Sequence, residues 1–344
     1  MPTRVLSSTR LRTGLLLSAV LLLATSCGWS LWDSPMTAVR PRSDLARWID
    51  ELFMLISWTT LVIFIAVEAI LVYACWRFRD RPGAPLPKQT HGHTALEMSW
   101  TIAFALVLLI IVIPTMKVIF RTQGTPADAS TALHVDVVGK QWWWEFKYPE
   151  LKITTANELH IPVGQTVIFS LHGPDVIHSF WVPGVAIGKR DVVPRRVNRI
   201  YMTPEVPGVY PGQCAEYCGT SHANMRFLVY VHPKEEFERW AKAQQAPPVE
   251  STDPAAQKGK EIYAQSACVG CHTIGGVSGG QIGPDLTHFG SRKTLAANMM
   301  PNTLENVARW VQNPPLVKPG ALMPNLGLTG EQSKALAAYL LSLK

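Results

Sequence analysis

Two long apolar runs constrain the first third of the chain. The first run covers residues 53–76 and carries one charged residue, Glu68; the second covers residues 100–120 and carries Lys117 near its end. About 20 apolar residues in a helix cross the hydrocarbon core of a bilayer. The sequence therefore predicts two transmembrane helices within residues 27–131. Glu68 either has a function inside the membrane or faces a partner helix.

The 26 residues at the N-terminus have the pattern of an export signal. Three arginines precede an apolar stretch, residues 15–24, that is too short to span a bilayer, and small residues follow it up to Cys27. Residues 24–27 loosely resemble the cleavage box of bacterial lipoproteins, with Ala24 in place of the usual Leu. Cys27 is therefore either a lipidated N-terminus or incidental. An exported start followed by two spans places everything after residue 131 on the outer face.

The charge distribution excludes nucleic-acid binding. The formal net charge is +7, but the 32 basic residues are spread over every segment of the chain. A nucleic-acid-binding protein concentrates its Lys and Arg on one face or domain.

Residues 132–242 have the pattern of an all-β domain. Pro and Gly separate short runs rich in β-branched and aromatic residues, which is typical of a sandwich or barrel. The clearest runs are 133–138, 158–161, 166–171, 199–202 and 227–231. A short helix is predicted at about 234–243.

Residues 243–254 form a polar linker with three prolines. Such a segment is expected to be a semi-rigid tether, and the charges of the flanking domains give no strong complementarity that would hold them together. Residues 255–344 are predicted to be helical, with helices near 254–265, 303–312 and 331–343. Thr329 and Gln332 fit a capping box for the last helix.

One short segment of the β domain is dense in soft metal ligands. It contains Cys214, Cys218, His222 and Met225. Two Cys and two His commonly bind zinc, but a thioether favours copper. Two thiolates can bridge two copper ions with one imidazole on each, and His178 is the best candidate for the second imidazole.

The sequence Cys268-Val269-Gly270-Cys271-His272 is the attachment motif of a c-type heme. Alone, a pair of cysteines could also bind zinc or perform redox chemistry. Export of the chain favours the heme, because heme c is attached outside the cytoplasm. The motif assigns Cys268 and Cys271 to the covalent bonds and His272 to the iron.

The sixth iron ligand is expected to be a methionine, which raises the heme potential. Met299, Met300 and Met323 compete for this position. Met323 is preferred because it lies in a loop just before the last helix.

Residues 40–242 resemble subunit II of cytochrome c oxidases. The family motif Cys-x-Glu-x-Cys-x-x-x-His-x-x-Met is matched at every position. The resemblance implies a cupredoxin fold and a binuclear CuA centre, in which Glu216 contributes its backbone carbonyl. It also implies that the Glu216 carboxylate reaches a magnesium ion at the interface with subunit I. The implied copper ligands are His178, Cys214, Glu216, Cys218, His222 and Met225.

The resemblance implies roles for three further residues. Trp142 begins the aromatic stretch 142–144 and corresponds to the surface residue through which electrons reach CuA. Glu97 corresponds to an acidic residue at the cytoplasmic mouth of a proton pathway into subunit I, although a Glu at a helix N-terminus is also stabilised by the helix dipole. Asp191 would contribute to the magnesium site, but its spacing from His178 is one residue longer than usual.

The whole chain resembles subunit II of a caa-type oxidase, in which a cytochrome c domain is fused after the copper domain. The expected fold is a multidomain membrane protein with two transmembrane helices, an all-β cupredoxin sandwich (132–242) and an all-α monoheme cytochrome c domain (255–344). The resemblance implies a multi-pass subunit of an oxidoreductase in the bacterial plasma membrane, in contact with lipid and with subunits I and III. Subunit I reduces dioxygen, and no catalytic residue is expected in this chain. The electron donor would be a cytochrome bc complex or another cytochrome c.

Three alternative functions share features with this sequence. The first is the CuA subunit of a nitric oxide reductase, against which Glu97 argues weakly. The second is a quinol oxidase subunit II, which has a similar fold but lacks copper, so the intact ligand set argues against it. The third is a copper-delivery or sensor protein, which would have no need of a fused heme.

Overall fold

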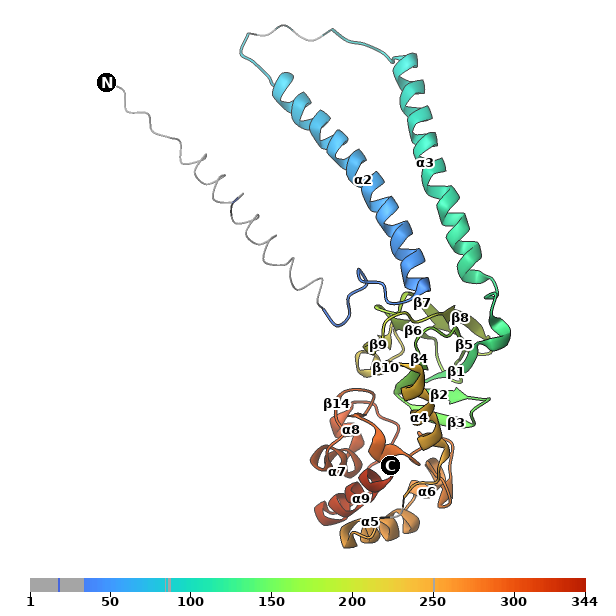
Figure 1. Ribbon diagram of the computed structural model, residues 1–344. Helices are drawn as coiled ribbons and strands as arrows, with labels where there is room; N and C mark the ends of the chain where they lie inside the picture. The colour runs from blue at the N-terminus through green and yellow to red at the C-terminus, as the bar shows by residue number, and fades with distance from the viewer. Residues whose placement is uncertain (1–17, 19–33, 84, 86–87, 250) are drawn as a thin grey trace. The chain divides into compact units, whose positions relative to one another are not determined.

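The computed structural model describes residue 18 and residues 34–344, with gaps at 84, 86–87 and 250 (Figure 1). The predicted export signal and Cys27 therefore fall outside the described residues, apart from residue 18. The chain forms two compact units: residues 47–129, and a second unit that includes residues 130–344.

Two long apolar helices account for the first unit. They are α2 (Asp44–Arg77) and α3 (Thr94–Gln123), and both are long and apolar enough to cross a membrane. They extend beyond the predicted spans because polar residues continue each helix at its ends. Asp44 lies in the first turn of α2 and Arg77 in its last turn, and both charges are favourable to the helix dipole.

The β domain is a sandwich of two five-stranded sheets, as the sequence predicts (Figure 1). One sheet has the strand order β3-β2-β1-β5-β8 and the other has the order β4-β10-β9-β6-β7. The strands are β1 (Leu133–Lys140), β2 (Trp143–Tyr148), β3 (Ile153–Ala156), β4 (Glu158–Pro162), β5 (Val167–His172), β6 (His178–Val182), β7 (Ala186–Val192), β8 (Asn198–Met202), β9 (Gly208–Cys214) and β10 (Arg226–His232).

Alternating burial along the strands builds the sandwich core. Every second residue of β1 is buried, so one face of the strand packs inward. Aromatic rings fill the interior: Trp144 contacts Phe180 and Phe227 at ring-centroid distances of 5.7 and 5.4 Å. Phe227 also packs on Phe146. Trp144 also contacts the His178 ring at a centroid distance of 6.1 Å, so this core adjoins a predicted metal ligand.

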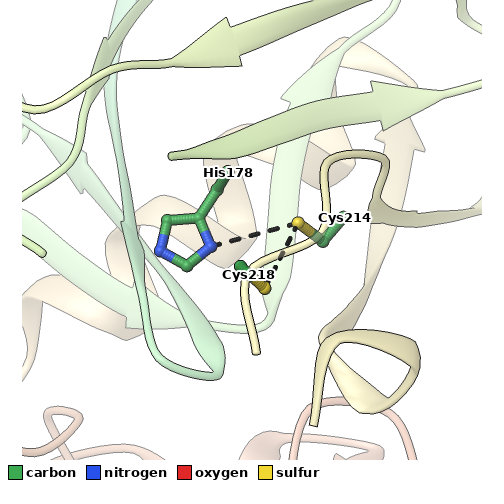
Figure 2. Close-up of side chains that lie close together, drawn as sticks. All are labelled: His178, Cys214 and Cys218. Carbon is green, nitrogen blue, oxygen red and sulfur yellow. Dashed lines mark hydrogen bonds between the residues drawn. The ribbon is translucent and has the colours of Figure 1, made fainter. Parts of the chain in front are cut away.

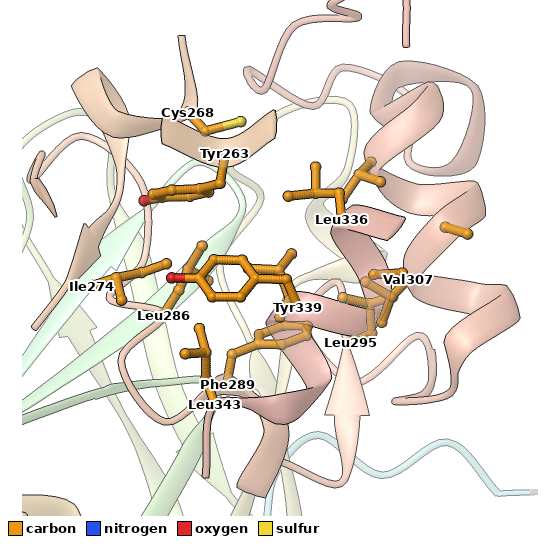
Figure 3. Close-up of a cluster of buried hydrophobic side chains, with 14 residues drawn as sticks. Tyr263, Cys268, Ile274, Leu286, Phe289, Leu295, Val307, Leu336, Tyr339 and Leu343 are labelled. Atoms are coloured by element: carbon orange, nitrogen blue, oxygen red, sulfur yellow. The ribbon is translucent and has the colours of Figure 1, made fainter. Parts of the chain in front are cut away.

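The C-terminal domain is helical, with two small β pairs that the sequence did not predict. Its core brings together side chains from α5, α7 and α9 around Tyr263 and Tyr339 (Figure 3). Thr329 and Gln332 form the predicted capping box of α9. The helices are α4 (Lys234–Gln245), α5 (Pro254–Gln265), α6 (Cys268–Cys271), α7 (Leu304–Gln312), α8 (Pro314–Val317) and α9 (Gly330–Ser342), and the short strands are β11 (Thr273–Ile274), β12 (Ser278–Gly279), β13 (Thr294–Leu295) and β14 (Met300–Pro301). Three short 3-10 helices, η1 (Ala129–Thr131), η2 (His222–Asn224) and η3 (Phe289–Ser291), complete the described elements.

The sandwich and the helical domain belong to one compact unit. The expectation that a tether alone keeps them close is therefore corrected. Helix α4 continues to Gln245, and the next residue, Ala246, accepts a hydrogen bond from His288 Nε2 at 3.0 Å. Charged side chains of each domain also bond to backbone groups of the other, and a count of net charge does not reveal such contacts.

Candidate metal centre and heme-attachment motif

Three of the predicted ligands form a buried cluster between β6 and β9 (Figure 2). His178 begins β6, Cys214 ends β9, and Cys218 lies in the loop that follows. The Sγ atoms of the two cysteines are 3.8 Å apart, and His178 Nδ1 is 3.9 Å from Cys214 Sγ. The strand pairing of Phe180 with Cys214 brings these residues together across the sheet.

The remaining predicted donors surround the same two sulfur atoms. His222 Nδ1 is 3.6 Å from Cys218 Sγ, and Met225 Sδ is 3.8 Å from that sulfur. The backbone carbonyl of Glu216 is 3.3 Å from Cys214 Sγ. The structure thus brings all six donors together around the cysteine pair.

Antiparallel strands hold the ligand loop in place. The backbone N–H of Cys214 donates to the carbonyl of Met225 at 2.9 Å, so the loop starts and ends at one point of the β9–β10 pair. Gly219 has a φ of +114°, a backbone conformation that residues with an L side chain rarely adopt. Short chain segments between fixed strands therefore pre-position the donors.

Asp175 orients the His178 ring, a role that the sequence motifs did not indicate. Its Oδ1 lies 2.8 Å from His178 Nε2, which leaves Nδ1 directed at the cysteines. Burial lowers the pKa of His178, but the hydrogen bond to Asp175 and the contact with Cys214 outweigh burial and raise it. The sequence did contain one signal for this role, a carboxylate three residues before the candidate ligand His178. Imidazoles that bind a metal commonly donate their other N–H to an acid.

Contact between the two thiols drives their pKa values apart. The hydrogen bond from Cys218 lowers the pKa of Cys214 to about 3, and the same contact raises the pKa of Cys218. Two sulfurs in contact repel each other when both are ionised, so two thiolates here need positive charge between them. Two thiolates, two imidazoles and a thioether fit copper better than zinc.

The heme-attachment motif lies on α6 and the residue after it. His272 Nδ1 is 2.8 Å from the carbonyl of Pro284, so this nitrogen donates and Nε2 is left to accept a metal. Gly283 allows this approach, because a Cβ there would lie 2.5 Å from the imidazole ring. Ile282 and Leu322 are each 75% exposed near the motif and the Met323 loop, and these apolar side chains fit a porphyrin that covers them.

The three candidate methionines differ in their surroundings. Met323 lies in the loop before α9 and packs against the domain core. The sulfur of Met300 accepts a hydrogen bond from Arg309 Nη2 at 3.7 Å, which uses its lone pair elsewhere. Met299 is half-buried outside that core. These contacts favour Met323 as the iron ligand.

Trp142 is buried, which corrects its predicted surface position. Its side chain is only 8% exposed, and a Cβ on Gly320 would lie 3.0 Å from its ring. The indole N–H donates to the carbonyl of Cys218 at 3.1 Å. Trp142 therefore lies between the cytochrome domain and the backbone of a cysteine in the metal cluster.

Comparison with known proteins decides the family. The sequence profile of the cytochrome c oxidase subunit II transmembrane domain matches residues 37–118, that of its periplasmic domain matches 150–231, and that of cytochrome c matches 256–344. Cytochrome c oxidase subunit 2 of Alkalihalophilus pseudofirmus is 36% identical, over 95% of this chain and 96% of the relative. The Bacillus subtilis subunit 2 is 33% identical, over 96% and 97%. This chain belongs to the cytochrome c oxidase subunit II family.

Structural comparison gives a further likeness. The periplasmic domain of subunit II of the Bradyrhizobium japonicum cytochrome oxidase is 30% identical, covers 36% of this chain and 97% of its own, and has a TM-score of 0.33. Family membership makes this chain a membrane-anchored oxidoreductase subunit with a cytochrome c domain, associated with other oxidase subunits. The comparisons give no support to the nitric oxide reductase or copper-delivery alternatives.

Two acidic residues expected at subunit II sites have local partners. The Glu97 carboxylate accepts from the backbone N–H of His93 at 3.1 Å and thereby caps α3. The Glu216 carboxylate binds Lys189 Nζ at 3.0 Å, and the same ammonium is 3.1 Å from Asp191 Oδ1. The magnesium and proton-pathway roles therefore remain predictions.

Proposed function

We propose that this subunit carries electrons from a covalent heme c through a binuclear CuA centre to the dioxygen-reducing subunit I. The observation that supports it is the convergence of two thiols, two imidazoles and a thioether around one pair of sulfur atoms. Copper and heme, when bound, supply one-electron chemistry, and the protein supplies ligands, burial and distance.

The residues of this chain have separate tasks in that function. Cys268 and Cys271 hold the heme covalently, while His272 and Met323 ligate its iron. Asp175 fixes the His178 ring against the cysteine pair. Burial of the cysteines keeps water from the thiolates, and Trp142 supplies a hydrogen-bonded contact to Cys218.

The surroundings of the subunit are part of the proposal. The copper and heme domains lie on the outer face of the bacterial plasma membrane, and subunits I and III adjoin the two apolar helices. A cytochrome bc complex or another cytochrome c delivers electrons to heme c. Glu97 lies at the start of a proton pathway on the opposite side, and the Glu216 carboxylate takes part in a magnesium site at the subunit I interface.

Metal analysis tests the copper assignment. The purified chain is expected to bind two copper ions and to show an EPR hyperfine pattern from one electron shared by two equivalent coppers. Cys218→Ser should abolish that pattern, because it removes one of the two thiolates that would hold the copper ions. Cys75→Ser is the matched control, since Cys75 is an exposed thiol on α2. A single copper ion with a mononuclear spectrum would contradict the proposal.

A further inference from the structure

A buried lysine of the cytochrome domain reaches the copper domain. Lys318 is only 4% exposed, and it lies in the loop between α8 and α9. Its Nζ donates to the carbonyls of Trp142 at 2.6 Å, Asn224 at 2.9 Å and Ala296 at 3.2 Å. An ammonium group has three N–H donors, so all of them are used.

Two of the three acceptors lie beside the predicted copper ligands, and the third lies in the cytochrome domain. Asn224 immediately precedes Met225, and Trp142 donates its indole N–H to Cys218. Ala296 lies in the cytochrome domain, in a run of three residues with positive φ (56°, 66° and 59°) that includes Ala297 and Asn298. Lys318 thus joins the ligand loop of the copper domain to the cytochrome domain in one hydrogen-bonded group.

The residues after Lys318 extend the same contact. Ser221 Oγ donates to the carbonyl of Pro319 at 2.5 Å, and Gly320 lies against the Trp142 ring. Met323 follows three residues later in this loop. One short segment therefore connects the proposed iron ligand to Trp142, which contacts the copper-ligand loop.

A second buried charged side chain extends from the copper domain to the cytochrome domain. Glu158 of β4 is 3% exposed, and its Oε1 accepts from the backbone N–H groups of Lys293 and Thr294 at 2.8 and 2.9 Å and from Thr294 Oγ1 at 3.1 Å. One charged side chain of each domain thus hydrogen-bonds to backbone groups of the other. Such bonds are directional and buried, so they fix one orientation of the two domains.

We infer that Lys318 is a positioning residue, which holds the cytochrome domain with Gly320 against Trp142 in the orientation used for electron transfer to the copper centre. This inference rests on the proposed function. Burial lowers the pKa of Lys318 to about 7, and the nearby Cys218 partly opposes that shift. The three carbonyls accept hydrogen bonds from the buried ammonium. A domain held only by a flexible linker would leave this ammonium group exposed to solvent.

Flash reduction of heme c in the full chain, loaded with heme and copper, measures the positioning role. In the wild type, copper reduction should follow at a rate independent of protein concentration and of solvent viscosity. In Lys318→Met the rate should fall about tenfold or more, because the docked state loses hydrogen bonds to a charged group. It should also become viscosity-dependent, while the spectra and potentials of heme and copper stay unchanged. Lys334→Met, the same change at an exposed lysine of α9, should leave the rate unaltered.

Hydrogen exchange provides a readout that does not depend on the copper. The amides of Lys293 and Thr294 are protected by Glu158 in the docked arrangement, so the segment 293–298 should exchange faster in Lys318→Met than in the wild type or Lys334→Met. Glu158→Ala provides a second variant if Lys318→Met fails to bind heme or copper, and it should slow electron transfer in the same way.

The outcomes separate the two proposals. A wild-type chain whose copper reduction slows in proportion to dilution would contradict transfer within one chain, and hence the proposed function. A wild type with fast internal transfer and a fully loaded Lys318→Met variant with the same rate and exchange would overturn the positioning role. Where Lys318→Met does not bind heme or copper, equal electron-transfer rates in Glu158→Ala and the wild type would overturn it as well.

Discussion

At the scale of single residues, the sulfur of Met323 decides the state of the heme iron. Met323→Leu should leave the heme covalently attached, because attachment needs only Cys268 and Cys271. It should remove the weak red absorption band of methionine-ligated ferric heme and lower the heme potential. Optical spectra and a redox titration of the variant measure both effects. Met300→Leu is the control, since its sulfur already bonds to Arg309; loss of the band there instead would move the ligand to Met300.

A stacked histidine pair makes the copper domain sensitive to acid. The His160 ring stacks on Tyr230 and Trp240 at 4.6 and 4.3 Å, and its Nδ1 is 2.8 Å from His232 Nε2. Burial lowers the pKa of both histidines below the ordinary 6.5. The unfolded chain therefore binds protons first as the pH falls, and folding stability is lost below about pH 6.5.

Denaturation of the copper-loaded chain between about pH 8 and pH 5 tests this dependence. The free energy of unfolding of the wild type should fall on the acid side, and His160→Phe should flatten that fall. His134→Gln, at a histidine paired with Glu150 on the surface, should keep the wild-type slope. An equal slope in His160→Phe and the wild type would exclude the pair as its source.

Single residues also show where sequence reasoning ends. Five of the six predicted metal donors could be named because their types and spacing form a motif, and His178 was the best candidate outside it. Asp175, Glu158 and Lys318 could not, because each acts on a ring or on backbone groups that only the folded chain brings near. Trp142 was recognised, but not its burial, since the covering residue, Gly320, comes from another domain.

At the scale of elements, one glycine sets the crossing of α5 and α9. A Cβ at Gly259 would lie 2.0 Å from the backbone carbonyl of Ala335, which cannot move without shifting α9. Gly259→Ala should therefore destabilise the cytochrome domain by about 1–3 kcal/mol, the usual cost of overpacking. Denaturation followed by heme absorbance measures the change. Gly330→Ala, where a Cβ meets nothing within 4 Å, should cost far less.

The predicted runs correspond to β1, β4, β5, β8 and β10, whereas β2, β3, β6, β7 and β9 lie outside them. The runs 133–138 and 227–231 lie within β1 and β10. Strands β7 and β9 were missed, because Gly, Pro and charged residues interrupt them and their neighbours in the sheet supply the pairing. The ends of α2 and α3 were missed for a related reason: hydropathy marks the apolar stretch, whereas capping and charge determine where a helix ends.

At the scale of the whole molecule, the copper and cytochrome domains belong to one compact unit, and buried contacts join them. Composition indicated the separate domains and the linker between them, but net charge could not indicate the packing. The contacts include two buried charged side chains, Lys318 and Glu158, that hydrogen-bond to backbone groups. Such an interface depends on shape and position, which a sequence does not display.

The covered cysteine pair has a consequence for how the cell builds this subunit. Cys214 and Cys218 are each 4% exposed, and Pro319 bonds to Ser221 beside His222. A protein that delivers copper cannot reach these sulfurs in the docked form. We therefore expect copper insertion to precede the docking of the cytochrome domain against the ligand loop.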